Sequence, residues 1–316
     1  MTVGRIAAGA APVRVRVPAK INLVLSVGDL RADDFHDIAT VYHAVDLYDE
    51  VTVRPSPRWS VRTDGHPDVP VGLKNLAGRA AKALQARLRG AGIGDIDPGP
   101  VAIEIAKQIP VAGGLAGGSA DAAAALVGCN ALWHVDLIRE DLAEVAAEIG
   151  SDVPFALYGG TMVGAGRGEL LSPVLTRMTL HWVLAFADNG MSTPAVFAEL
   201  DRLRAGGRSL PAGDVDQVVA ALRSGKVNDV ASALGNDLQA AAVSLHPGLR
   251  RTVRAGVDSG ALAAIVSGSG PTVALLCEDA THAAGIAAHM AATGTCRAVR
   301  TVSGPVPGAR VVAGPL

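Results

Sequence analysis

The chain is poor in cysteine, carries almost no net charge and contains no long apolar run. Its three cysteines, Cys129, Cys277 and Cys296, are odd in number, widely spaced and surrounded by apolar residues. This pattern argues against a disulfide framework and a zinc site, and it predicts a protein of the reducing cytoplasm. The net charge of −2 and the pI near 6.4 leave no basic surplus to neutralise a nucleic-acid backbone. We therefore expect no polynucleotide partner.

No stretch approaches the roughly 18 uninterrupted apolar residues of a membrane span, so we expect no membrane association. Near the start, Arg5 precedes a short run of alanine and glycine that resembles a signal peptide only in outline, because leucine is missing and VRVRV soon follows. We expect a frayed tail here. The chain is 49% hydrophobic and 316 residues long, which is enough for two domains or one large one.

Strand and helix patterns are mixed along the chain rather than regularly alternating. Alternating valines predict a strand piece at 13–17, and alternating isoleucine and leucine predict another at 21–25, separated from the first by Pro18. Apolar residues at helical spacing predict a helix at 75–88, which Gly90 ends. The other expected elements are a strand at 46–53, a helix at 137–149 ended by Gly150, a strand at 179–188 and two strands within 260–279. This mixture predicts an α+β fold.

The most informative segment is PVAGGLAGGSADAAAAL, at 110–126, where four glycines and a serine precede an alanine-rich helical run. A strand at 101–105 precedes it, and Pro110 closes that strand. Glycine lets the backbone approach a ligand closely, and the first N–H groups of a helix have no partner within the helix. We therefore predict a phosphate site, with Ser119 as N-cap and Asp121 as a favourable charge in the first turn.

Two common phosphate motifs do not fit this segment. Gly113 and Gly118 have the spacing of a P-loop, but Ser119 stands where that motif requires lysine, and no GxGxxG register fits. The alternative interpretation is a glycine-rich turn that packs tightly against its neighbours and holds no ligand.

Three segments together resemble the GHMP small-molecule kinases, which include galactokinase, homoserine kinase and mevalonate kinase. The loop at 110–126 is similar to the family pattern P-x-x-x-G-L-G/A-x-S. VPAKINLVLSV, at 17–27, resembles the N-terminal block of the family, and VSGSGPTVALL, at 266–276, resembles its C-terminal glycine block. Four further segments, PAKINL, RADDFH, GSDVPF and STPAVF, resemble the branch whose acceptor is an alcohol linked to cytidine diphosphate.

The resemblance implies a fold and a reaction. The expected fold is the two-domain GHMP kinase architecture, with an N-terminal domain like the second domain of ribosomal protein S5 and a ferredoxin-like C-terminal domain. We place the domains at 1–175 and 176–316, with the site in the cleft between them. The expected reaction is transfer of a phosphoryl group from ATP to the 2-hydroxyl of the cytidine diphosphate alcohol, with Mg²⁺ bridging the phosphates. We expect a monomer or a weak homodimer.

Phosphoryl transfer needs a phosphate cradle, a cation and a carboxylate that aims the accepting hydroxyl. Lys20 and Asn22 are two residues apart on an expected strand, so their side chains share one face. Asp152 follows a helix stop and directly precedes a short predicted helix, where an N-cap role is common. By resemblance, Lys20 and Asp152 form the catalytic pair, and Asp152 is the candidate base. The alternatives are a solvated strand end for Lys20 and a helix cap for Asp152.

The resemblance also implies the ligand contacts. The nucleotide is expected at Asn75, Lys107, Pro110, Gly113, Gly114, Leu115, Ala116, Gly117, Gly118 and Ser119, and the metal ion at Ser119. The acceptor is expected at Asn22, Phe35, His36, Asp152, Thr193 and Phe197. The segment 268–270 is expected to brace the phosphate loop. For Lys107, an exposed position at a strand end remains the alternative.

The acceptor segment departs from the family pattern R-x-D-G-Y-H at two positions. Asp34 stands where glycine is common, and Phe35 replaces tyrosine, which keeps the ring face and loses a hydroxyl. Two other functions therefore stay open. One is a GHMP kinase acting on another small alcohol, and the other is a nucleotide-binding regulator without catalysis, against which the presence of both Lys20 and Asp152 argues.

Overall fold

The computed structural model describes residues 4–5, 11–32, 34–65, 69–91, 96–207 and 213–314. Its strands form an eight-stranded sheet, a four-stranded sheet and a two-stranded pair of β1 (Gly4–Arg5) with β5 (Ile96–Asp97). The strands of the eight-stranded sheet are β2 (Val13–Leu30), β3 (His36–Pro55), β4 (Ser60–Thr63), β6 (Val101–Ala106), β7 (Thr161–Ala165), β8 (Leu170–Pro173), β10 (Gly235–Asn236) and β14 (Arg310–Ala313).

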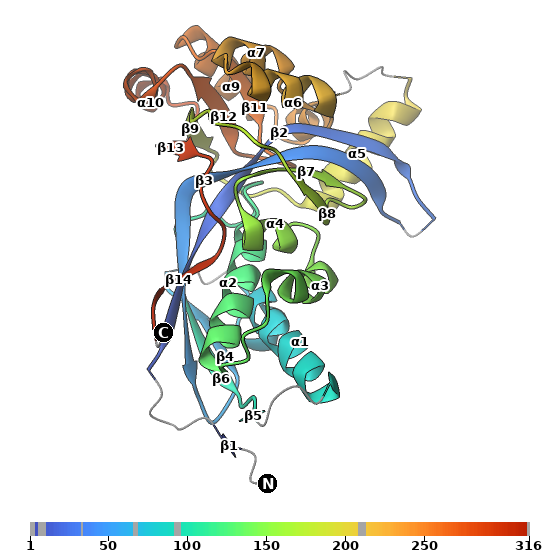
Figure 1. Ribbon diagram of the computed structural model, residues 1–316. Helices are drawn as coiled ribbons and strands as arrows, with labels where there is room; N and C mark the ends of the chain where they lie inside the picture. The colour runs from blue at the N-terminus through green and yellow to red at the C-terminus, as the bar shows by residue number, and fades with distance from the viewer. Residues whose placement is uncertain are drawn as a thin grey trace.

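The antiparallel strands β2 and β3 extend from the lower part of the molecule into the upper part (Figure 1). The predicted break at Pro18 is wrong, because β2 is continuous through this residue. Instead, the pairing of β2 with β3 shifts its register between Pro18 and Ala19, and such an irregularity accommodates a residue that has no N–H to donate. Lys20 and Asn22 therefore lie in mid-strand.

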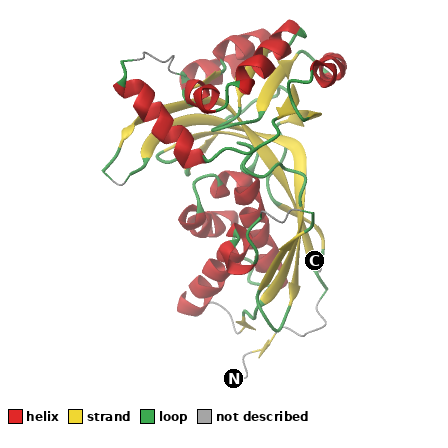
Figure 2. Ribbon diagram, turned by 180° about the vertical axis from the view of Figure 1, so that it is seen from behind, coloured by secondary structure: helices red, strands yellow, loops and turns green. Residues whose placement is uncertain are grey.

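Four helices cover one face of the eight-stranded sheet, as the view from behind shows (Figure 2). They are α1 (Leu76–Ala91), α2 (Gly117–Leu132), α3 (Arg139–Ile149) and α4 (Val153–Tyr158), and the short 3-10 helix η1 (Gly72–Lys74) precedes α1. The helices expected at 75–88 and 137–149 are confirmed as α1 and α3. However, α1 continues through Gly90, whereas Gly150 does end α3.

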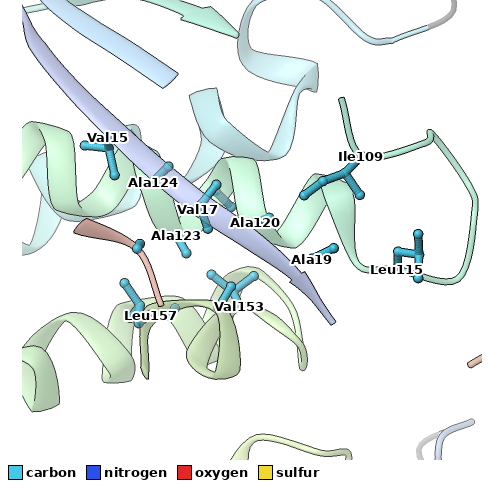
Figure 3. Close-up of a cluster of buried hydrophobic side chains, with 14 of the residues drawn as sticks. Val15, Val17, Ala19, Ile109, Leu115, Ala120, Ala123, Ala124, Val153 and Leu157 are labelled. Carbon is cyan, nitrogen blue, oxygen red and sulfur yellow. The ribbon is translucent and has the colours of Figure 1, made fainter. Parts of the chain in front are cut away.

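The alanine-rich face of α2 lets β2 pack closely against it (Figure 3). Val15 and Val17 of β2 and Ala124 of α2 are all fully buried. Ile109, which precedes the glycine-rich loop, and Leu115, which lies within it, belong to the same buried cluster. Burial of these apolar side chains stabilises the loop at its start and at its middle, so the start of α2 is fixed relative to β2.

The second sheet is antiparallel, in the order β11-β12-β9-β13. Its strands are β9 (Leu180–Phe186), β11 (Ala263–Val266), β12 (Val273–Cys277) and β13 (Ala298–Gly304). The helices of this part are α5 (Thr193–Ala205), α6 (Val215–Ser224), α7 (Val227–Ala233), α8 (Gln239–Leu245), α9 (Gly248–Asp258) and α10 (Ala280–Thr293). Strand, helices, two strands, helix and strand follow in the β-α-β-β-α-β order of a ferredoxin-like domain, so this expectation is confirmed.

Two later strands return to the first sheet. β10 pairs in parallel with β2 near Val24, and β14 pairs antiparallel with β2 near Val15, so the C-terminus lies beside β2 (Figure 1). The chain thus crosses between the two parts more than once, and the division into 1–175 and 176–316 stays a prediction. Among the described residues, the structure contains no helix that is both long and apolar enough to cross a membrane.

Candidate active site

A cavity of about 810 Å³ is lined by residues from both halves of the chain. Its walls come from β2 and β3, the glycine-rich loop with the first turn of α2, α5, and the segment 268–269. The expected site residues that line it are Lys20, Asn22, Phe35, His36, Gly113, Gly114, Ala116, Gly117, Gly118, Ser119, Asp152, Thr193 and Phe197. The expected site residues outside its lining are Asn75, Lys107, Pro110 and Leu115.

Lys20 and Asp152 meet in this cavity. The Lys20 ammonium lies 3.9 Å from Asp152 Oδ2 and donates a 2.5 Å hydrogen bond to Asn22 Oδ1. The side chain of Lys20 is 7% exposed, so the solvated strand end is wrong. Burial lowers the pKa of Lys20, and the charge of Asp152 opposes that effect. The geometry places a cation and a carboxylate side by side at one end of the cavity.

Asp152 occupies the N-cap position of α4, but its side chain makes no cap hydrogen bond. Instead, Oδ1 accepts a 3.0 Å hydrogen bond from the Tyr42 hydroxyl, and the Tyr42 ring stacks on Phe155 at 4.8 Å between centroids. Burial, followed by the charge of Asp152, raises the pKa of Tyr42, so the phenol keeps its proton. Tyr42 therefore orients the carboxylate. Sequence reasoning missed this residue, because an aromatic residue in a strand is common and does not by itself indicate a role in a site.

The glycine-rich loop is bent by left-handed residues. Positive φ angles occur at Ala112 (51°), Gly114 (77°) and Ala116 (57°), and each such alanine costs roughly 1–2 kcal/mol. Ala116 is the N-cap residue and α2 begins at Gly117, so the N-cap expected at Ser119 is wrong. Because Ser119 is the third helical residue, its N–H belongs to the unpaired first turn that faces the cavity.

The C-terminal glycine block braces this loop. Ser267 Oγ donates to the carbonyl oxygen of Gly114 at 3.1 Å, and Thr272 N donates to that of Gly113 at 3.3 Å. From the other side, Lys20 N donates to the carbonyl oxygen of Leu115 at 3.3 Å. The bracing expected at 268–270 is confirmed, with the flanking residues making the hydrogen bonds.

Replacing Gly114 with alanine is expected to lower the free energy of unfolding by about 1–3 kcal/mol. A Cβ at this position would lie 2.1 Å from the backbone oxygen of Ser267, and the φ of +77° disfavours any side chain. Urea titration would measure the loss. The matched control is Gly285→Ala in α10, where a Cβ meets no atom within 4 Å and helix propensity favours alanine by up to about 1 kcal/mol. Equal stability of the two variants would contradict close packing between loop and brace.

Lys107 lies beneath the loop in a buried ion-pair triad. Its Nζ is 2.5 Å from Asp49 Oδ2 and 2.8 Å from Asp121 Oδ2, and the three side chains are 2%, 0% and 3% exposed. Asp49 Oδ1 also accepts the backbone N–H groups of Gln108 and Ile109, which lead into the loop. Burial by itself lowers the pKa of Lys107, but the two carboxylates outweigh it and raise that pKa.

This triad corrects two expectations. Lys107 is neither an exposed strand end nor part of the cavity lining, and Asp121 is an ion-pair partner rather than a charge in the first turn of α2. Asn75 also has a structural role, because its Oδ1 accepts from Ala77 N and its Nδ2 donates to the oxygen of Pro70, both at 2.9 Å. The side chains of Asn75 and Lys107 are thus occupied within the fold.

The other end of the cavity carries aromatic rings. The rings of His36 and Phe197 lie 5.1 Å apart at 35°, and His36 Nε2 is 2.9 Å from Asp201 Oδ1. Thr193 Oγ1 is hydrogen-bonded to Ser269 Oγ at 2.9 Å, which ties α5 to the glycine block. Sequence reasoning missed Asp201, although the four-residue spacing from Thr193 to Phe197 continues to it on the same helical face.

Phe35 is 49% exposed at this end. The guanidinium carbon of Arg167, from the turn between β7 and β8, lies 5.2 Å from the centroid of its ring. Asp34 has a φ of 62°, a left-handed conformation that aspartate tolerates better than most residues. This explains how aspartate replaces the glycine of the family pattern. Arg167 lines the cavity but was not foreseen from the sequence.

Comparison with known proteins gives matches to two family models and to full-length relatives. Residues 75–160 match the GHMP kinases N terminal domain, and residues 218–296 match the GHMP kinases C terminal domain. A 4-diphosphocytidyl-2-C-methyl-D-erythritol kinase of Nocardia farcinica is 56% identical over 303 residues, covering 95% of this chain and 96% of the relative. The protein of the same name from Mycobacterium tuberculosis is 53% identical, covering 96% and 94%.

Solved structures share the fold. The crystal structure of a 4-(cytidine 5'-diphospho)-2C-methyl-D-erythritol kinase is 32% identical with a TM-score of 0.71, and the match covers 92% of this chain and 98% of that one. A homoserine kinase from Cytophaga hutchinsonii, 21% identical, has a TM-score of 0.72 over 97% and 99% of the two chains, which speaks for the fold alone. The cavity, the braced phosphate loop and these similarities lead to one conclusion: the chain belongs to the GHMP kinase family.

Proposed function

We propose that the protein phosphorylates the 2-hydroxyl of 4-diphosphocytidyl-2-C-methyl-D-erythritol with ATP, giving the 2-phosphate and ADP, in the non-mevalonate route to isoprenoid precursors. The observation that carries the proposal is one cavity with a phosphate loop and the Lys20–Asp152 pair at one end and the His36–Phe197 rings at the other. Relatives named for this kinase, at 53% and 56% identity, support the choice of acceptor.

The phosphates of ATP bind at the start of α2. There the unpaired N–H groups of the first turn and the positive end of the helix dipole attract an anion. The loop is held in its bent form by the hydrogen bonds to Ser267, Thr272 and Lys20 before any ligand arrives. Since little reorganisation is needed, the bound phosphates gain the full benefit of these donors.

Mg²⁺ is expected with the nucleotide because it would neutralise the charge of the phosphates during transfer. Within the described ranges, no cluster of three or more His, Cys, Asp or Glu side chains is placed to hold a metal ion. Asp121 is occupied by Lys107 beneath the loop, whereas Ser119 lines the cavity. Ser119 would therefore be the protein residue that holds the ion.

In the transfer step, the acceptor oxygen attacks the γ-phosphorus and the bond to the β,γ-bridging oxygen breaks, releasing ADP. Asp152 orients the accepting hydroxyl and takes its proton, because its Oδ1 is held by Tyr42 while its side chain remains 30% exposed to the cavity. The Lys20 ammonium, fixed by Asn22, stabilises the negative charge that develops on the transferred group.

The cytosine of the acceptor binds at the ring end. Phe197 and Phe35 offer ring faces for stacking, and His36 is held in place by Asp201. The hydrogen bond from Thr193 to Ser269 links the helix that carries Phe197 to the brace of the phosphate loop. The helix that contacts the acceptor is thereby connected to the segment that supports the donor site.

ADP release in a coupled assay tests the proposal. With 4-diphosphocytidyl-2-C-methyl-D-erythritol we expect turnover in the usual range of about 1–10³ s⁻¹, and at least about 100-fold lower kcat/KM with the same alcohol lacking the cytidine diphosphate group. Homoserine and mevalonate serve as control acceptors. Equal kcat/KM for an acceptor without the cytidine diphosphate group would favour a kinase for another alcohol. Binding of ATP without any turnover would favour a regulator.

We also infer a reducing cytoplasm and a monomer or weak homodimer. The first inference is supported by the free thiols of Cys129, Cys277 and Cys296. Sedimentation at several concentrations tests the oligomeric state.

A further inference from the structure

Arg167 is placed at the cavity by a rigid turn. Ile38 N donates to the oxygen of Gly166 at 2.7 Å, which pins the turn to β3, and Gly168 N donates to the oxygen of Ala165 at 2.9 Å. Arg167 N donates to Glu169 Oε2 at 2.7 Å, closing the turn from inside. Three hydrogen bonds therefore fix the backbone from which the guanidinium reaches the cavity.

Glu169 and Phe35 contact the side chain of Arg167, and the rest of the side chain is accessible from the cavity. Its Nε lies 3.5 Å from Glu169 Oε1, and its guanidinium stacks over Phe35. Among the described residues, neither terminal nitrogen of Arg167 donates a hydrogen bond, and the ion pair with Glu169 is formed at Nε. The side chain is 34% exposed and lines the cavity, so these two donors are accessible to a ligand.

The charges of the cavity make this arginine distinctive. The charged or titratable side chains that line it are Lys20, Asp34, His36, Tyr42, Asp152, Arg167 and Asp201. Lys20 is committed to Asp152 and Asn22, and the carboxylates outnumber the permanent cations. An acceptor with two phosphates between a ring and an alcohol needs a cation between the two ends, and Arg167, stacked on the ring-end residue Phe35, supplies one.

We propose that Arg167 is a specificity-determining residue that binds the diphosphate of the acceptor. This inference rests on the proposed function and adds to it the group that distinguishes a nucleoside diphosphate from a nucleoside. A guanidinium presents two parallel donors to phosphate oxygens, which an ammonium does not. Stacking on Phe35 holds the planar group in place and lowers the entropy lost on binding.

Calorimetric titration with cytidine 5'-diphosphate and with cytidine tests this role, with the donor site filled by a non-hydrolysable ATP analogue. We expect the wild-type protein to bind the diphosphate more tightly than cytidine. In Arg167→Met the diphosphate should bind roughly 10- to 100-fold more weakly, as for loss of charge-assisted hydrogen bonds, while cytidine binding stays unchanged. Arg167→Lys should recover part of the difference.

The outcomes separate this inference from the function on which it rests. Weak binding of both ligands to the wild-type protein would overturn the cytidine acceptor itself. A preference for the diphosphate that persists in Arg167→Met would overturn only the role of Arg167, and so would equal weakening of both ligands, which would indicate that the arginine merely supports Phe35. The control Arg254→Met removes an exposed arginine of α9 that pairs with Asp258, and it should bind both ligands like the wild type.

Discussion

Replacing Asp152 with asparagine is expected to lower kcat by about 10²–10⁴, the range typical of loss of a general base. Asparagine keeps the shape of the side chain and still accepts the hydrogen bond from Tyr42. It cannot take the proton of the attacking hydroxyl, and it removes the negative partner of Lys20. KM for ATP should change by less than about threefold, because the donor binds at the phosphate loop. Steady-state kinetics with both substrates would measure the effect.

The control for this variant is Glu148→Gln, which makes the same chemical change at an exposed position of the neighbouring helix α3. It should leave kcat and KM unchanged. Both variants should unfold at the temperature of the wild type within a few degrees, since neither carboxylate caps a helix. An Asp152→Asn protein with full turnover would remove Asp152 from the mechanism.

The largest expected loss of stability follows from Lys107→Met. The lysine is the cation between two carboxylates that are 0% and 3% exposed, and removing one partner of a buried ion pair costs about 3–5 kcal/mol. Methionine fills a similar volume, so the lost free energy of unfolding measures the effect of removing the charge and not the effect of creating a cavity. Urea unfolding would measure the free energy. The substitution should also loosen the start of the phosphate loop, because Asp49 holds the backbone of Gln108 and Ile109.

A neutral replacement of Asp121 separates the charge of Lys107 from the other contacts of the triad. Burial raises the pKa of Asp121, although Lys107 opposes the shift, and Asp121 Oδ1 has no hydrogen-bond partner among the described residues. Burial thus disfavours the charged form of this carboxyl, and the neutral replacement Asp121→Asn should change stability by less than about 1 kcal/mol. If it cost as much as Lys107→Met, the triad would depend on two full negative charges.

The loss of unfolding free energy caused by Lys107→Met should also depend on pH. Without the ammonium, Lys107 no longer opposes the burial that raises the pKa of Asp121 above that of the unfolded chain. A raised pKa in the folded state means that stability is present at low pH and is lost as the pH rises through that value. We therefore expect a smaller deficit at about pH 5 than at about pH 8. A deficit that does not vary with pH would contradict this account.

Much of the site could be predicted from the sequence because its parts are local. The strand, glycine-rich turn and helix at 101–126 follow one another, and the proposed anion site uses backbone N–H groups within that one segment. Lys20 and Asn22 share a strand face, and Thr193 and Phe197 share a helix face. Neighbours of this kind are recognisable from spacing alone.

Other residues could not be predicted because their roles depend on contacts between distant segments. Tyr42 and Asp152 are 110 residues apart, and Lys107 is 58 residues from Asp49. Strand alternation shows that Tyr42 faces one side of a sheet, but it does not show which carboxylate lies across from it. The wrong N-cap at Ser119 has a similar cause, because a left-handed Ala116 caps the helix three residues before the expected N-cap.

The sequence by itself determined the α+β class, the glycine-rich loop before α2, the lysine and aspartate of the proposed catalytic pair and the family. Tertiary structure alone decided that Lys107 serves the fold, that Tyr42 orients Asp152 and that Arg167 reaches the cavity. The physical reason is that backbone geometry and hydrogen-bonding capacity act over a few residues of the chain. The charge environment and burial of a side chain depend instead on which distant segments fold against it.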